Sequence, residues 1–123
     1  MEISPIGTVD TPFSSTEEAP RQGATTDAVG TIRVKHEYIE ALDGLESGDR
    51  IVVVWFADRA DRSLLRADRR GNVGVFDTRS PARPNPICLT TCEIVSIDRN
   101  RLEIRGVDML DGSPILDLKP ELD

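Results

Sequence analysis

Hydrophobic and polar residues alternate with a period of two along much of the chain, which is the pattern of β-strands that bury one face. Residues 30–35 alternate in this way, and residues 87–97 form a long stretch rich in β-branched side chains. Residues 51–56 are continuously apolar, which predicts a central strand buried on both faces. The polar triplet at 98–100 separates the long stretch from residues 102–107 and predicts a hairpin turn between two strands.

The remaining elements are predicted to be short. Further strands are expected at residues 3–9, 75–76 and 115–118. Residues 111–114 have the composition of a tight turn. Apolar residues at helical spacing predict a short helix over 36–42, and one helical turn is expected around Leu64 and Leu65.

These elements add up to six or seven short strands with antiparallel connections and little helix. The sequence shows no alternation of strands with helices, no internal repeat and no second domain, and 123 residues suffice for one hydrophobic core. A closed barrel protects the exposed edges of so many short strands. The predicted fold is therefore mainly all-β, a single-domain antiparallel β-barrel over residues 1–123 with short helical segments.

Residues 10–28 form a polar segment that interrupts this pattern. Its composition is typical of a mobile loop. Pro20 and Gly23, however, flank Arg21 and Gln22 closely enough to present a cation and an amide to a ligand. The sequence leaves both interpretations open.

Charge is distributed unevenly along the chain. The 22 acidic residues outnumber the 15 basic ones, so the protein as a whole has no general attraction to nucleic acids. Between Asp58 and Arg83, however, seven arginines accompany four aspartates, a local excess of three positive charges. A polyanion is expected to dock on this segment if it docks anywhere.

Several function classes are excluded by what the sequence lacks. It has no apolar run of about 18 residues and no signal-peptide pattern, so a cytoplasmic protein without a membrane span is expected. His36 is the only histidine, which rules out mechanisms that need a histidine pair. Cys88 and Cys92 are expected to be buried free thiols, and no bound metal is expected because the spacing of a metal site is missing.

The most distinctive stretch runs from residue 74 to 89 and contains three prolines and two arginines. Each proline restricts its own φ and the residue before it, so Ser80, Arg83 and Asn85 should be held in defined directions. Guanidinium groups in a stiff loop suit the bidentate binding of a carboxylate or phosphate. The alternative is a connection between strands whose arginines are merely solvated.

Three polar turns, at residues 20–22, 79–85 and 111–114, thus precede or follow clearly predicted strands. In a barrel these turns would converge at one rim, which is the geometry of a binding site. The sequence contains neither a glycine-rich phosphate loop nor a nucleophile elbow that would indicate a different chemistry.

Three motifs at these turns carry a resemblance to a known family. They are Glu18-Ala19-Pro20-Arg21-Gln22-Gly23, the stretch from Gly74 to Leu89, and the stretch from Asp108 to Pro120. Together they resemble the TrmO (TsaA-like) family in its short, single-domain form. The resemblance implies an antiparallel barrel that acts as a homodimer and transfers a methyl group from S-adenosylmethionine. The implied acceptor is N6 of threonylcarbamoyl-adenosine at tRNA position 37.

The resemblance also implies site residues. The cofactor contacts would be Pro20, Arg21, Gln22, Arg79, Leu89, Asp111, Gly112, Ser113 and Pro114. Ala57 would be a further contact, at the end of the buried strand where family members usually carry a histidine, and Cys88 replaces a usual glycine. Arg83 and Asn85 would hold the tRNA substrate.

The roles follow from ordinary chemistry. Arg79 or Arg21 would bind the methionine carboxylate, and Leu89 would pack on the adenine. Methyl transfer from a sulfonium is an in-line displacement that depends mainly on alignment, so no general base is assigned. Asp77 and Asp111 are the candidates for a residue that accepts the N6 proton. Two alternatives are a non-catalytic S-adenosylmethionine-binding or adenosine-ligand-binding barrel that regulates a partner, and methyl transfer to a small molecule.

Overall fold

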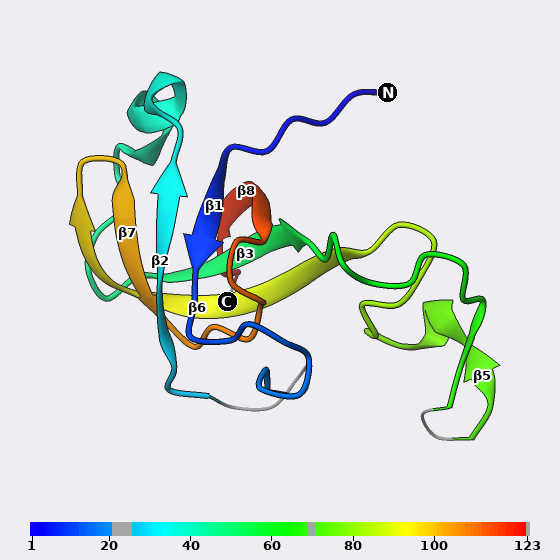
Figure 1. Cartoon of the computed structure of the whole chain (residues 1–123). Coiled ribbons are helices and arrows are strands. Elements are labelled where there is room, and N and C mark those ends of the chain that lie inside the picture. The colour runs from blue at the N-terminus through cyan, green and yellow to red at the C-terminus, as the bar shows by residue number, and fades with distance from the viewer. Residues whose placement is uncertain (21–25, 69–70, 123) are drawn as a thin grey trace.

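The computed structural model describes residues 1–20, 26–68 and 71–122. Six strands form a closed barrel in the order β1-β2-β7-β6-β3-β8, and every neighbouring pair is antiparallel (Figure 1). Their bounds are Gly7–Asp10 for β1, Val29–Val34 for β2, Arg50–Phe56 for β3, Ile87–Asp98 for β6, Arg101–Arg105 for β7 and Pro114–Pro120 for β8. The predicted mainly all-β antiparallel barrel is confirmed.

The core fills the inside of the barrel with aliphatic side chains from alternate strand positions. Inward residues with at most 1% of their surface exposed include Val9, Ile32, Ile51, Val53, Ile94, Leu102, Ile104 and Ile115. Because successive strand residues point to opposite faces, the residues between them point outward. The core therefore rests on β-branched and leucine side chains, with Trp55 as its one large aromatic residue.

The prediction that residues 51–56 are buried on both faces is wrong. Ile51, Val53 and Trp55 are buried, whereas the alternate residues Val52, Val54 and Phe56 are only half-buried. In a closed barrel only the inner face of a strand reaches the core, so a continuous apolar run does not imply a buried outer face.

The seam that closes the barrel is the pairing of β1 with β8, and it is short. Gly7 pairs with Ile115 of β8 on one side and with Val34 of β2 on the other. A side chain at residue 7 would overlap the backbone carbonyl oxygen of Arg33. Only glycine lets the β2 backbone approach this closely, so Gly7 permits the tight β1–β2 pairing directly beside the seam.

The other connections agree in part with the predictions. The turn at residues 99–100 joins β6 to β7, with Arg99 at φ 57°, and Gly112 has φ 82° in the turn before β8. The helix over His36–Leu42 (η1) is present as a 3₁₀ helix. The opening strand begins at Gly7, later than predicted, since Pro5 before it has no N–H to donate to a ladder.

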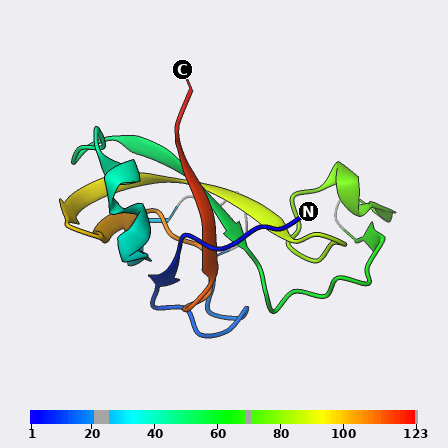
Figure 2. The same ribbon diagram turned by 90° about the horizontal axis from the view of Figure 1, so that it is seen from above.

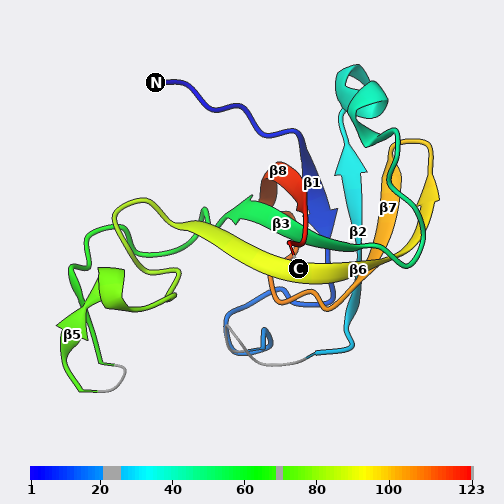
Figure 3. The same ribbon diagram turned by 180° about the vertical axis from the view of Figure 1, so that it is seen from behind.

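Residues 57–86, which we call the arm, connect β3 to β6 and project away from the barrel in all three ribbon views (Figures 1, 2 and 3). The arm carries the elements β4 (Arg66–Ala67), β5 (Val73–Gly74) and the 3₁₀ helix η2 (Val75–Asp77).

Two predictions on the arm are wrong. Leu64 and Leu65 form no helical turn but lead into β4, and the Leu65 carbonyl accepts a hydrogen bond from the Val75 N–H. Residues 75–76 belong to η2 rather than to a strand. Here the N–H and the hydroxyl of Thr78 both donate to the Val75 carbonyl, at 3.0 and 2.8 Å, and tertiary pairing overrides the extended preference of valine.

Strand direction decides which connections share a rim. The ends of β1, β3 and β7 lie at the same rim as the beginnings of β2, β6 and β8, because all neighbours are antiparallel. The loop 11–28, the arm and the loop 106–113 therefore leave the barrel at one rim, while η1 and the turn at 99–100 lie at the other. The topology thus brings the connections that carry the three polar turns to one rim, as predicted, although residues 21 and 22 of the first turn lie outside the described residues.

The close approach at Gly7 predicts that Gly7→Ala destabilises the protein by about 1–3 kcal/mol, since the added methyl meets backbone atoms that cannot rotate away. The control is Gly74→Ala, where the added methyl would lie 3.9 Å from its nearest neighbour and φ is −65°. That variant should be unchanged or about 0.4–1 kcal/mol more stable. Urea unfolding monitored by Trp55 fluorescence measures the stability of both variants. Equal midpoints for Gly7→Ala and wild type would contradict the importance of the close backbone approach at Gly7.

Candidate functional site

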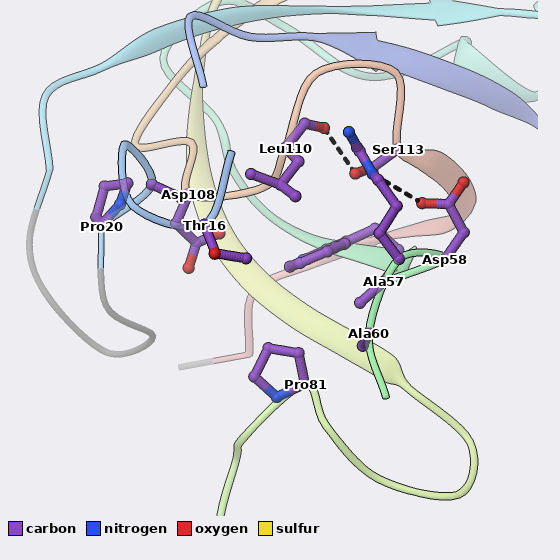
Figure 4. A pocket seen from close by; sticks show the side chains of 12 residues that line it. Thr16, Pro20, Ala57, Asp58, Ala60, Pro81, Asp108, Leu110 and Ser113 are labelled. Atoms are coloured by element: carbon purple, nitrogen blue, oxygen red, sulfur yellow. Dashed lines mark hydrogen bonds and ion pairs between the residues drawn. The ribbon is translucent and has the colours of Figure 1, made fainter. Parts of the chain in front are cut away.

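A cavity of about 260 Å³ opens at the rim where the three loops leave the barrel (Figure 4). Its apolar lining consists of Ala19, Pro20, Trp55, Ala57, Ala60, Pro81 and Leu110. Its polar lining consists of Thr16, Asp58, Arg59, Asp108 and Ser113. Segments far apart in the sequence therefore build one concave surface, apolar for the most part with a few converging polar groups, as is usual for small-molecule sites.

The loops around the cavity are tied together through Asp111. Its carboxylate accepts a hydrogen bond from the Thr11 N–H at 2.9 Å, and its own N–H donates to the Phe13 carbonyl at 2.7 Å. Its carbonyl accepts a hydrogen bond from the Arg59 guanidinium at 2.8 Å. Asp111 thus joins all three rim loops, which is a structural role at the edge of the cavity.

Arg59 is the guanidinium that lines the cavity. Besides the bond to the Asp111 carbonyl, its Nε lies 3.5 Å from the Asp58 carboxylate, and the ion pair is drawn in Figure 4. Both side chains of the pair are nearly half exposed, so the pair is weak and a ligand carboxylate can compete for the guanidinium.

A chain of hydrogen bonds joins Trp55 and Asp108, two residues of the cavity lining, through Thr90. The indole Nε1–H of Trp55 donates to Thr90 Oγ1 at 3.0 Å, and the Thr90 hydroxyl donates to Asp108 Oδ1 at 2.6 Å. Burial raises the pKa of the Asp108 carboxyl above its usual value, and the Thr90 bond partly opposes that shift. Asp108 is thus a carboxyl group with an altered proton affinity that borders the cavity.

The proline-rich loop is ordered by its own polar groups. The Arg83 guanidinium donates to the carbonyls of Thr78 and Ser80 at 2.9 and 3.2 Å and lies 6.0 Å from the Phe76 ring centroid. Asn85 accepts a hydrogen bond from Arg62 at 3.1 Å. The loop therefore holds defined side-chain directions, as its prolines predict, although Arg83 and Asn85 lie outside the cavity lining.

The structure brings together only part of the predicted site. Pro20, Ala57 and Ser113 line the cavity. Asp111 and Gly112 precede Ser113 in its loop and Pro114 begins β8, and none of these three lines the cavity. Arg21 and Gln22 lie outside the described residues.

Three other predicted residues lie at or beyond the edge of the cavity. Arg79 donates to the Leu89 carbonyl at 3.3 Å, and its charge lowers the pKa of Asp108, so Arg79 lies near Asp108. Leu89 is on the outer face of β6 and is 45% exposed. Asp77 is exposed in η2 on the arm. The roles assigned to these residues stay predictions.

Sequence reasoning missed Trp55, Arg59 and Asp108 as cavity residues. Trp55 had a usable signal, since it follows Ile51 and Val53 at a spacing of two and so points inward at the rim end of β3. Arg59 was recognised only as one of seven arginines in the charged segment. Asp108 belongs to the third motif but follows Val107 in a loop, where no periodicity indicates its direction.

Cys88 and Cys92 are buried free thiols, as predicted. Burial raises the pKa of Cys88 to about 11 and that of Cys92 to about 12. Both therefore remain protonated near neutral pH and are poor nucleophiles.

Among the described residues, no helix is both long and apolar enough to cross a bilayer.

The fold and the cavity define a small closed antiparallel barrel with a ligand-sized site at one rim. Residues 8–123 match the model of the tRNA-methyltransferase O N-terminal domain, so the chain belongs to the TrmO N-terminal domain family. The predicted family is confirmed.

Comparisons with individual proteins agree. The chain is 54% identical to a Halobacterium salinarum protein named "Probable S-adenosyl-L-methionine-binding protein", with 100% of each chain covered. It is 46% identical to an Archaeoglobus fulgidus "S-adenosyl-L-methionine-binding protein", covering 100% of this chain and 93% of that protein. A crystal structure of TrmO superposes with a TM-score of 0.85 at 32% identity, covering 99% of this chain and 57% of that one. The chain therefore spans little more than half of that TrmO chain.

Proposed function

We propose that the rim cavity binds S-adenosylmethionine and that the protein transfers the methyl group to N6 of threonylcarbamoyl-adenosine at tRNA position 37. One observation carries the proposal: apolar walls, a guanidinium and a partly buried carboxyl group converge in a single cavity. S-adenosylmethionine has matching parts, namely a flat adenine, an α-carboxylate and two cationic groups. The names of the two archaeal relatives support the same cofactor.

The residues of the cavity suit this ligand. Trp55, Pro81 and Leu110 would enclose the adenine, and Arg59 would bind the carboxylate in exchange for its weak pair with Asp58. The contacts that the resemblance implies would extend this set with Pro20, Arg21, Gln22 and Ala57 and with residues 111–114. Arg79 and Leu89 would complete the site at the edge near Asp108.

The bound cofactor supplies an activated methyl group on a sulfonium. The protein contributes alignment and exclusion of water, which supply most of the acceleration of such a displacement. The arm provides cations for the tRNA, with Arg62, Arg66 and Arg83 among its described residues. Arg83 and Asn85, held in defined directions by the proline-rich loop, are the proposed substrate contacts.

We also propose a homodimer, with apolar outer surface of one protomer covering that of its partner. Leu65, Phe76, Ile87 and Leu89 are 69%, 80%, 44% and 45% exposed, and Phe56 on the adjacent outer face of β3 is half-buried. Such a concentration of exposed apolar side chains on the arm and on β6 is typical of an interface.

Ile87→Asp combined with Leu89→Asp should convert a dimer to a monomer, since unpaired charges in an apolar interface are costly to bury. Sedimentation equilibrium at micromolar concentration measures the mass, with Thr91→Asp on the same strand as the control. A wild-type protein that sediments as a monomer of 13.6 kDa contradicts the dimer.

The cavity assignment predicts micromolar binding of S-adenosylmethionine, a free energy of about −8 kcal/mol. Ala60→Trp should weaken that binding at least about tenfold, because the indole would occupy the cavity. Isothermal titration calorimetry measures both affinities. The same substitution at Ala41, an exposed residue of η1 at the opposite rim, is the control and should bind as the wild type does. Equal affinity in all three proteins would place the ligand elsewhere.

The methyltransferase activity predicts that label from S-[methyl-³H]adenosylmethionine enters tRNA that carries threonylcarbamoyl-adenosine. Nucleoside mass spectrometry should show one added methyl group on that nucleoside and none in tRNA lacking the threonylcarbamoyl group. Turnover that persists without any tRNA would instead indicate a small-molecule acceptor.

A second candidate function is a non-catalytic S-adenosylmethionine-binding barrel that regulates a partner. It is favoured by the formal charge of −7, which opposes tRNA binding outside the arm, and by the names of the archaeal relatives, which mention binding alone. Cofactor binding without methylation of tRNA would support this alternative and overturn the enzymatic proposal.

A further inference from the structure

While Asp108 is ionised, the hydrogen-bond chain from Trp55 through Thr90 to Asp108 has one direction. An indole N–H is a donor and never an acceptor, so Thr90 Oγ1 must accept from Trp55. The Thr90 hydroxyl hydrogen is then free to point at Asp108 Oδ1, 2.6 Å away. The chain thereby holds the carboxyl group in one orientation at the cavity wall, where Asp108 is labelled in Figure 4 beside Thr16 and Pro20.

The surroundings of Asp108 resemble those of a functional acid more than those of a structural one. Among the described residues, no salt bridge includes Asp108, although its side chain is partly buried. Burial of a carboxylate is costly unless it is compensated, and groups left in this condition within a cavity are frequently catalytic.

Desolvation raises the pKa of Asp108, and its charged and titratable neighbours do not reverse that shift. Arg79 lowers its pKa and is the nearby cation on the β6 side. Cys88 and Cys92 on β6 also face it, and both thiols stay neutral because burial raises their own pKa values. Asp58 and Arg59 line the same cavity from the beginning of the arm. Desolvation remains the largest influence on Asp108.

The other acidic residues near the rim are less suitable. Asp77 is exposed on the arm, and Asp111 uses its carboxylate to accept the Thr11 N–H outside the cavity lining. Asp58 lines the cavity but is exposed and pairs with Arg59 at 3.5 Å. Asp108 is thus the carboxyl group that combines a place in the cavity with burial and a fixed orientation.

The proposed reaction needs such a group. In threonylcarbamoyl-adenosine, N6 is a urea nitrogen whose lone pair is delocalised into the carbonyl group and the purine ring. It becomes a good nucleophile only as its proton leaves, so a positioned base should accelerate the transfer by about 10²–10⁴-fold. A carboxylate with raised proton affinity is better suited to this role than an ordinary one.

We infer that Asp108 is the general base of the reaction and that Thr90 is a residue that positions it, an inference that rests on the proposed function. The N6–H bond breaks and its proton moves to the Asp108 carboxylate. The N6 electron pair forms the bond to the methyl carbon, and the electrons of the carbon–sulfur bond remain on sulfur. One positive sulfonium and one carboxylate are thereby replaced by a neutral thioether and a neutral carboxyl group, so charge balances.

The first test is Asp108→Asn, which keeps the shape of the side chain and removes its basicity. Single-turnover methylation of threonylcarbamoyl-adenosine tRNA should slow at least about 100-fold. Calorimetric affinity for S-adenosylhomocysteine, which lacks the positive sulfur, should stay within about threefold of wild type and shows that the cavity is intact.

The second test uses Thr90, where Thr90→Val removes the donor and Thr90→Ser retains it. Because the Thr90 bond lowers the pKa of Asp108, Thr90→Val should raise that pKa further, and Thr90→Ser should restore it. The acidic limb of the rate against pH should move to higher pH in Thr90→Val alone. A ¹³C NMR titration of the Asp108 carboxyl carbon in protein without cofactor gives the same comparison independently of activity.

The outcomes separate the two proposals. If the wild type methylates tRNA and Asp108→Asn does so at the same rate, or if the Asp108 carboxyl titrates identically in Thr90→Val and wild type, the role of Asp108 is overturned while the proposed function stands. If the wild type binds S-adenosylhomocysteine but methylates no tRNA, both proposals are overturned.

Discussion

Closure of a six-stranded sheet is the constraint on which the other features of this protein depend. The pairing of β1 with β8 is brief, and Gly7, which takes part in it, lets the β2 backbone approach closely on its other side. Closure leaves the barrel sheet without an edge and creates an inside that a small set of aliphatic side chains can fill. It also places alternate connections at the same rim, and so assembles a site from segments far apart in the sequence.

The site combines two kinds of polar interaction with different purposes. Asp111 and its three hydrogen bonds join the rim loops to one another and hold the cavity open in one shape. Asp108 is held by Thr90 at the cavity wall, with its remaining carboxylate surface next to the space a ligand would occupy. The aspartate with the richer network is therefore the scaffold, and the aspartate with the poorer one is the candidate for chemistry.

The arm carries an excess of positive charge, whereas the protein as a whole is acidic. The protein is acidic overall, yet its arginines gather between the end of β3 and the beginning of β6, on the segment that projects from the barrel. Several of these arginines are used within the arm, since Arg62, Arg66 and Arg83 all donate to nearby carbonyl groups. Their charge remains available to a polyanion even where their hydrogen bonds are local, because the electrostatic field does not depend on direct contact.

The sequence by itself determined the class of fold, the main strands and the family, because period-two alternation, turn residues and long motifs are local signals. It also placed the three polar turns beside strong strands, from which their convergence follows once the strands are antiparallel. Only the tertiary structure decided that the outer face of residues 51–56 is half-buried and that Val75 begins a 3₁₀ helix rather than a strand. It alone distinguished Asp108 from Asp111 and placed Arg59 in the cavity, since the direction of a side chain in an irregular loop depends on hydrogen bonds to segments distant in the sequence.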